Sequence, residues 1–135
     1  MKLTKKSEYA CLALIELSEN YNKGLVRIED ISKRKKIPKK YLEQILLLLK
    51  GAGYVKSIRG AQGGYKLSKP PGDITVAEIL RLTGGALSPV SSASVYFYES
   101  SPVENNRKLM DFFIDIRDYI AKKSEETTFA DLIEE

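Results

Sequence analysis

A chain of 135 residues with one cysteine, Cys11, and no histidine has room for about one domain with appendages. A single cysteine excludes an internal disulfide, and the lack of histidine excludes zinc fingers and histidine-dependent catalysis. Residues 1–72 hold 16 Lys and Arg against 6 Asp and Glu, net +10, whereas residues 73–135 hold 6 against 12, net −6, and so concentrated a positive charge favours a polyanionic partner, nucleic acid or a membrane surface.

The longest aliphatic run, residues 45–49, is far shorter than the roughly 18 residues of a membrane span, and residues 1–6 lead into no signal-peptide core. We therefore expect a soluble protein of the cytoplasm. No histidine can activate a serine and no glycine-rich phosphate loop precedes a helix, so the sequence does not favour an enzyme.

The N-terminal part is typical of a helix-turn-helix unit. Residues 9–17, YACLALIEL, are apolar nearly all round and predict a buried helix. Ile28 and Ile31 share one face of a short second helix, whose first turn holds Glu29. After the turn KKIPKK, Pro38 suits the first turn of a third helix, because that position needs no N–H donor.

The third helix, KKYLEQILLLLKGAG, is predicted to end at Gly51 or Gly53 and has two unlike faces. One face is predicted to enter the core: Tyr41, Leu42, Ile45, Leu46, Leu48 and Leu49. The opposite face gathers Lys40, Glu43, Gln44 and Leu47. YVKSI and YKLS then bracket RGAQGG, which predicts a hairpin with its tip at residues 59–64. The expected fold is mainly α with a small β-hairpin wing, a winged helix-turn-helix over residues 1–72.

Residues 73–135 are predicted to hold a linker helix, a sensor-like loop over 84–103, a dimerisation helix over 104–124 and a C-terminal tail. Thr75 and Glu78 form a capping-box pattern at the start of the linker helix. The long helix carries an apolar stripe that either completes the core or packs against a second copy of the chain. The tail, TTFADLIEE, is expected to dock by Phe129, Leu132 and Ile133. The residues of the long helix that are predicted to mediate dimerisation are Leu109, Phe112, Phe113, Ile116 and Ile120.

The glycine-tipped hairpin suits a narrow DNA groove, because Gly60, Gly63 and Gly64 permit a sharp turn and a close approach while Arg59 projects a planar cation. The alternative is a tight hairpin with an incidental surface arginine. On the third helix, Gln44 has the chemistry to pair with adenine, and Glu43 either accepts from cytosine N4 or pairs with Lys39 or Lys40. Phosphate contacts are expected from Lys5, Lys6, Tyr9 and residues 33–36.

The segments MKLTKKSEYACLALIEL, IPKKYLEQIL, VKSIRGAQGGYKL, ITVAEILRLTGG and TTFADL together resemble the Rrf2 family of winged-helix transcriptional regulators. The resemblance implies a homodimeric transcription factor, usually a repressor, that places paired recognition helices in successive major grooves of double-stranded operator DNA and wing arginines in the minor groove. Lys40 departs from the small polar residue common at its position. The resemblance implies DNA contacts from Lys40, Glu43, Gln44 and Arg59, with Lys5 and Tyr9 on phosphates. The full set of predicted DNA-binding residues also includes Lys39, Tyr41, Gly60, Gly63 and Gly64.

Sensing members of this family hold an iron–sulfur cluster on three loop cysteines, sometimes with an acidic ligand near position 8, and respond to redox, iron–sulfur or nitric-oxide status. The loop here contains no cysteine, so the resemblance implies no cluster in the chain as written. A cluster-free regulator controlled by a small molecule or a partner protein, as in the cysteine-metabolism branch, is the alternative. A further hypothesis is that Ser92 and either Ser100 or Ser101 replace native cysteines, with Glu8 as an accessory ligand.

Overall fold

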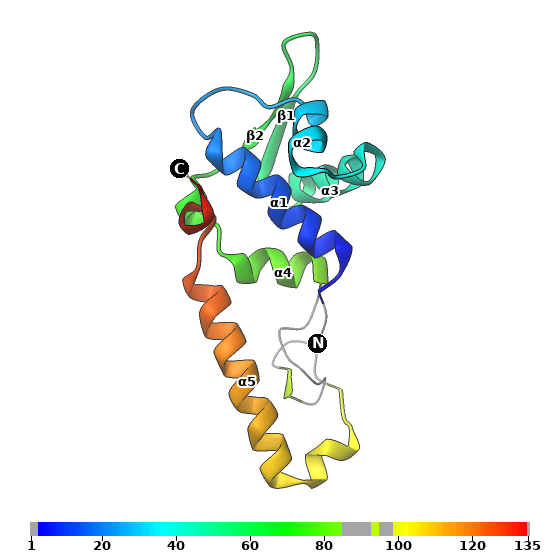
Figure 1. Cartoon of the computed structure of the whole chain (residues 1–135), viewed down its shortest axis with the longest axis vertical. Coiled ribbons are helices and arrows are strands. Elements are labelled where there is room, and N and C mark those ends of the chain that lie inside the picture. The colour runs from blue at the N-terminus through cyan, green and yellow to red at the C-terminus, as the bar shows by residue number, and fades with distance from the viewer. Residues whose placement is uncertain (1–2, 85–92, 95–98, 135) are drawn as a thin grey trace.

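The computed structural model of the chain describes residues 3–84, 93–94 and 99–134 (Figure 1). Five α-helices and one hairpin follow one another in these ranges, and short 3-10 helices join or end them. The expectation of a mainly helical fold with a β-hairpin wing is confirmed. The elements are α1 (Lys5–Glu19), α2 (Ile28–Lys35), α3 (Lys39–Gly51), β1 (Val55–Ile58), β2 (Gly64–Leu67), η1 (Pro71–Asp73), α4 (Val76–Gly84), η3 (Pro102–Asn105), α5 (Arg107–Glu126) and η4 (Phe129–Leu132).

The main core lies where α1, α2, α3 and β1 meet. Leu14 of α1, Ile31 of α2 and Leu46 of α3 have no exposed surface there. Burying side chains of this size stabilises a fold by about 1.5–3 kcal/mol each before the entropy cost is counted. This packing fixes the angle at which α3 presents its other face to solvent.

Local signals in the sequence set the helix ends. Thr4 caps α1 by accepting a hydrogen bond from the Ser7 amide at 3.1 Å, so α1 begins at Lys5, earlier than predicted. Pro38 precedes the first helical residue of α3 as its N-cap. The predicted capping box at α4 is confirmed, because the Glu78 amide donates to Thr75 Oγ1 at 3.2 Å and Glu78 Oε2 accepts from the Thr75 amide at 2.8 Å.

The wing pairs β1 with β2 in antiparallel register, with Val55 opposite Leu67 and Ile58 opposite Gly64. A third segment adds to its base, because Val26 and Tyr65 exchange two backbone hydrogen bonds of 2.8 Å. Gly64 is required at this junction, since a Cβ there would lie 2.7 Å from the Val26 carbonyl oxygen. The wing is therefore tied to the chain that enters α2.

The C-terminal part packs on the winged helix at both of its ends. Helix α4 lies against α1, and α5 extends away from the winged helix (Figure 1). The chain then returns, because Thr128 bridges to Thr75 and η4 contacts α1 and η1. Phe129 is fully buried in the main core, as predicted, Ile133 is half-buried, and Leu132 is 36% exposed.

Two predictions about α3 are wrong in part. Tyr41 does not enter the core: its side chain is 36% exposed, and its ring packs edge-on against Tyr9 of α1, with centroids 5.3 Å apart. The aromatic partner holds Tyr41 at the surface. Leu48 is only half-buried, whereas Leu42, Ile45 and Leu49 are in the core as expected.

None of the described helices is long and apolar enough to cross a membrane.

Candidate nucleic-acid interface

Helix α3 presents a polar face with one leucine to solvent. Lys40, Glu43, Gln44 and Leu47 are all exposed, as the spacing predicts. The buried residues of α3 lie on the opposite face and hold the helix in place. An exposed polar face on the second helix of a helix-turn-helix unit is the surface that enters a DNA major groove in proteins of this architecture.

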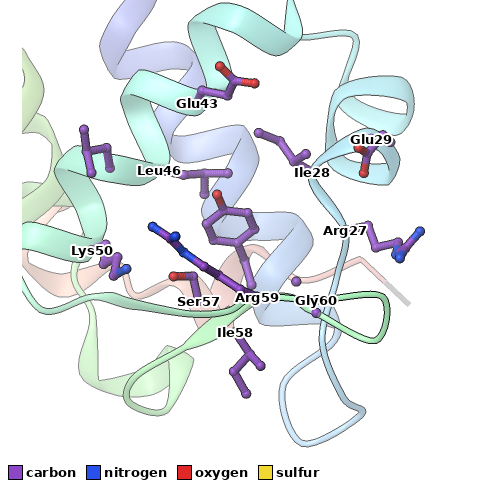
Figure 2. A pocket seen from close by; sticks show the side chains of 14 residues that line it. Arg27, Ile28, Glu29, Glu43, Leu46, Lys50, Ser57, Ile58, Arg59 and Gly60 are labelled. Atoms are coloured by element: carbon purple, nitrogen blue, oxygen red, sulfur yellow. The ribbon is translucent and has the colours of Figure 1, made fainter.

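A groove with a volume of about 500 Å³ separates α3 from the wing (Figure 2). Glu43 and Lys50 line it from α3, and Arg59 lines it from the wing; Figure 2 shows the three side chains around one hollow. Glu43 of the predicted helix residues is thus brought together with the predicted wing residues, although they are far apart in sequence. The groove is not lined by the other predicted residues of α3, which are Lys39, Lys40, Tyr41 and Gln44. The other lining residues are Arg27, Ile28, Glu29, Leu46, Leu47, Ser57, Ile58, Gly60, Gly63, Gly64 and Tyr65.

The wing tip has the backbone geometry that its glycines predict. Gly60 has a φ of 110°, which L side chains rarely adopt, and Gly63 donates to the Gly60 carbonyl at 3.0 Å. Arg59 is exposed and forms no ion pair with any residue that the structure describes. Its guanidinium group is available to a phosphate or a base edge.

Arg27 is a contributor that sequence reasoning missed. Its guanidinium group donates to the Ala61 carbonyl at the wing tip, across 34 residues of sequence. Arg27 is also the N-cap of α2, where its side chain makes no capping hydrogen bond. Arginine is not a preferred N-cap residue, and this mismatch is the signal that could have identified a second role. Arg27 therefore connects the entrance of α2 to the tip of the wing.

At the start of α1, Tyr9 contacts the first turn of α3, and Lys5 lies one turn before Tyr9. Lys5 Nζ lies 6.0 Å from the centre of the Tyr9 ring and 3.7 Å from Glu8, and the Tyr9 ring contacts Tyr41. Both residues belong to α1, which starts four residues before the predicted helix. Behind them, buried Ser7 shares a 2.8 Å hydrogen bond with Thr83 of α4, which anchors this end of the helix.

Ion pairs account for several charges of the N-terminal part. Lys39 pairs with Glu29 of α2 at 3.3 Å and not with Glu43, which has no ion-pair partner among residues 3–84, 93–94 and 99–134. A hydrogen bond from its own backbone amide and a second from Lys39 lower the pKa of Glu29. Arg34 and Lys35 pair with carboxylates of α1, at 2.9 and 3.5 Å. Arg34, Lys35 and Lys39 are thus paired within the protein, whereas Glu43 keeps its acceptor oxygens available.

No residue of α5 is fully buried, so the interpretation of its stripe as part of the core is wrong for most of its length. Phe112 and Tyr119 are 57% and 69% exposed, and Leu109 is 41% exposed. Phe113, Ile116 and Ile120 are half-buried, and Ile120 contacts the small apolar cluster that Ala77 and Leu80 of α4 form. Among residues 3–84, 93–94 and 99–134, α5 has too few neighbours to cover such a stripe.

The chain's donor set does not fit an iron–sulfur cluster. Its one cysteine, Cys11, is half-buried in α1, where burial raises the pKa of the thiol to about 11. In the part of the chain that the structure describes, no group of His, Cys, Asp or Glu could hold a metal ion. Ser92 lies outside the described residues; Ser100 donates to Glu104 at 2.8 Å, Ser101 is half-buried, and Glu8 pairs with Lys5.

The winged-helix architecture and the groove between α3 and the wing define a DNA-binding transcriptional regulator. The chain belongs to the Rrf2 family, described as iron-dependent transcriptional regulators, which it matches over residues 3–135. It is 34% identical over 132 residues to the HTH-type transcriptional regulator CymR of Bacillus subtilis, covering 98% of this chain and 89% of CymR. It is 44% identical over 82 residues to the regulator IscR of Cereibacter sphaeroides, covering 59% of this chain and 53% of IscR.

Solved structures agree with this assignment. The structure of CymR, the global cysteine regulator of B. subtilis, is 33% identical, covers 98% of this chain and 95% of its own, and superposes with a TM-score of 0.79. IscR of T. potens is 30% identical, covers 98% of this chain and 85% of its own, and gives a TM-score of 0.74. The whole described architecture is therefore that of an Rrf2 regulator.

Proposed function

We propose that the protein is a homodimeric, sequence-specific repressor of the cytoplasm, not an enzyme, and that residues 1–72 bind operator DNA. The observation that carries the proposal is the common groove between α3 and the wing. Glu43 of α3 and Arg59 of the wing line this groove from opposite sides, and neither has an ion-pair partner among the described residues. Helix α3 would read base edges in the major groove while Arg59 enters the adjacent minor groove.

The individual contacts follow from the chemistry of the exposed side chains. Gln44 can pair with adenine, and Glu43 can accept from cytosine N4. Lys40 and Lys5 would contact phosphates, with Tyr9 and Tyr41 beside them, and Lys39 would do so by exchanging its surface pair with Glu29 for a phosphate. Exposed ion pairs are worth only about 0.2–1 kcal/mol, so this exchange costs little.

Dimerisation is proposed through α5. Its exposed aromatic residues, Phe112 and Tyr119, form an apolar surface of the kind that mediates protein association. A two-fold axis at α5 would present two copies of α3 to half-sites about one helical turn of DNA apart, roughly 34–36 Å. A dimer bound in this way occupies its operator and excludes other proteins from it, which supports repression.

The experiment is a gel-shift titration against salt, with an operator selected from genomic fragments. If Lys5, Lys39, Lys40 and Lys50 each neutralise one phosphate, a dimer makes about eight contacts, and log K should fall against log salt with a slope of roughly −7. A winged helix that binds only protein would select no DNA fragment. Binding to DNA that does not change with salt would equally contradict the proposal.

A further inference from the structure

Leu47 is an apolar side chain on the face of α3 that is otherwise polar. It is 70% exposed, the most of the large apolar residues described. It lies four residues after Glu43 and three after Gln44, so the three side chains occupy one stripe of the helix. Single exposed leucines are common on protein surfaces, but this one lines the groove that faces the wing.

Cations lie on both sides of Leu47 along the helix. Lys40 precedes it by seven residues and Lys50 follows it by three, and both are exposed. At 1.5 Å per residue, the two lysines are about 15 Å apart along the axis, which is comparable with the major-groove width of about 12 Å. The two lysines would therefore meet the phosphates at the walls of the groove, and Leu47 between them would lie over base edges.

We propose that Leu47 recognises the 5-methyl group of a thymine in each half-site, an inference that rests on the proposed DNA-binding function. Leucine has no hydrogen-bonding group, so it cannot satisfy the donors and acceptors of the other major-groove edges. The thymine methyl group is the apolar feature of that code. Leu47 thus adds a preference for thymine beside the bases that Glu43 and Gln44 read.

The test measures operator affinity while the thymidines of the selected operator are replaced one at a time by deoxyuridine, which removes only the methyl group. For the wild-type protein, deoxyuridine at one position of each half-site should lower the operator affinity about fourfold, which corresponds to ~0.8 kcal/mol for one buried methyl-sized group. Deoxyuridine at the other positions should have little effect. Leu47→Ala should bind the thymine operator about fourfold more weakly per half-site and should be insensitive to deoxyuridine at that position. Leu47→Met, which keeps an apolar side chain, should retain the penalty.

Three results would overturn the inference. In the first, the loss of affinity caused by deoxyuridine is the same in Leu47→Ala as in the wild-type protein. In the second, Leu47→Ala weakens binding to all DNA sequences equally, which indicates contact with the sugar-phosphate backbone. In the third, Leu47→Ala alters the sedimentation coefficient, which indicates a protein interface. In each of these cases the wild-type protein still selects its operator, so the proposed function stands. A wild-type protein that selects no operator contradicts both.

Discussion

Replacing Gly63 of the wing with alanine should produce a steric clash whose size follows from the structure. A Cβ atom on Gly63 would lie 2.1 Å from the Ile58 carbonyl oxygen and 2.9 Å from the Arg59 carbonyl carbon. Carbon–oxygen contacts are normally about 3.3 Å or longer, so Gly63→Ala overlaps by roughly 1 Å with backbone that no rotamer change can move. The turn between Gly60 and Gly63 must open. The lost hydrogen bond and the rearranged tip should lower the free energy of unfolding by about 1–3 kcal/mol.

Urea denaturation measures this loss, and Gly51→Ala is the matched control. A Cβ atom on Gly51, the last residue of α3, would meet nothing within 4 Å, so this variant should be neutral or stabilised by up to about 1 kcal/mol. Because the altered tip displaces Arg59, Gly63→Ala should also weaken operator binding, whereas Gly51→Ala should not. A Gly63→Ala protein with wild-type unfolding and affinity would refute the wing geometry.

Three further predictions concern Cys11, Glu78 and Phe112. Burial raises the pKa of Cys11 from 9.0 to about 11, so iodoacetamide should react roughly one hundredfold more slowly with the folded protein than with the unfolded chain; equal rates would contradict this burial. Burial raises the pKa of Glu78, but hydrogen bonds from Thr75 and Tyr54 outweigh it, and the pKa lies below its ordinary 4.5. The stabilisation of the fold by ionised Glu78 is thus present above about pH 4.5 and is lost as the pH falls through the folded-state pKa. Urea unfolding should show Glu78→Gln about 1 kcal/mol less stable than wild type at pH 7, and this difference should shrink in acid. A difference that stays constant with pH would contradict the assignment. Phe112→Asp should shift the dimer towards monomer in sedimentation without unfolding the chain, and an unchanged dimer would exclude α5 as the interface.

Features encoded over short stretches of sequence could be predicted. The capping box of Thr75 and Glu78 spans only four residues, and both of its hydrogen bonds form. The exposed stripe of α3 follows from helical periodicity, because Lys40 and Leu47 are separated by two turns. The glycines at the wing tip predicted a hairpin because few other residues adopt a φ such as the 110° of Gly60.

Features that depend on contacts distant in sequence could not be predicted. The surface position of Tyr41 depends on an aromatic partner on α1, and the hydrogen bond from Arg27 to Ala61 depends on how the wing folds back towards α2. The bridge between Thr75 and Thr128 likewise joins segments that no local pattern connects. The apolar stripe of α5 was visible in the sequence, but only the structure shows that no residue of α5 is buried.

The central claim is that α3 and the wing act together on one duplex, and Arg59→Ala tests it most directly. Operator affinity is measured for this variant and for Lys56→Ala, which removes an equal charge from an exposed wing residue outside the groove. Arg59→Ala should lose about 1–3 kcal/mol of operator binding, a factor of roughly 5 to 150, with unchanged unfolding. Lys56→Ala should lose much less. Equal affinities for wild type and Arg59→Ala would contradict the account.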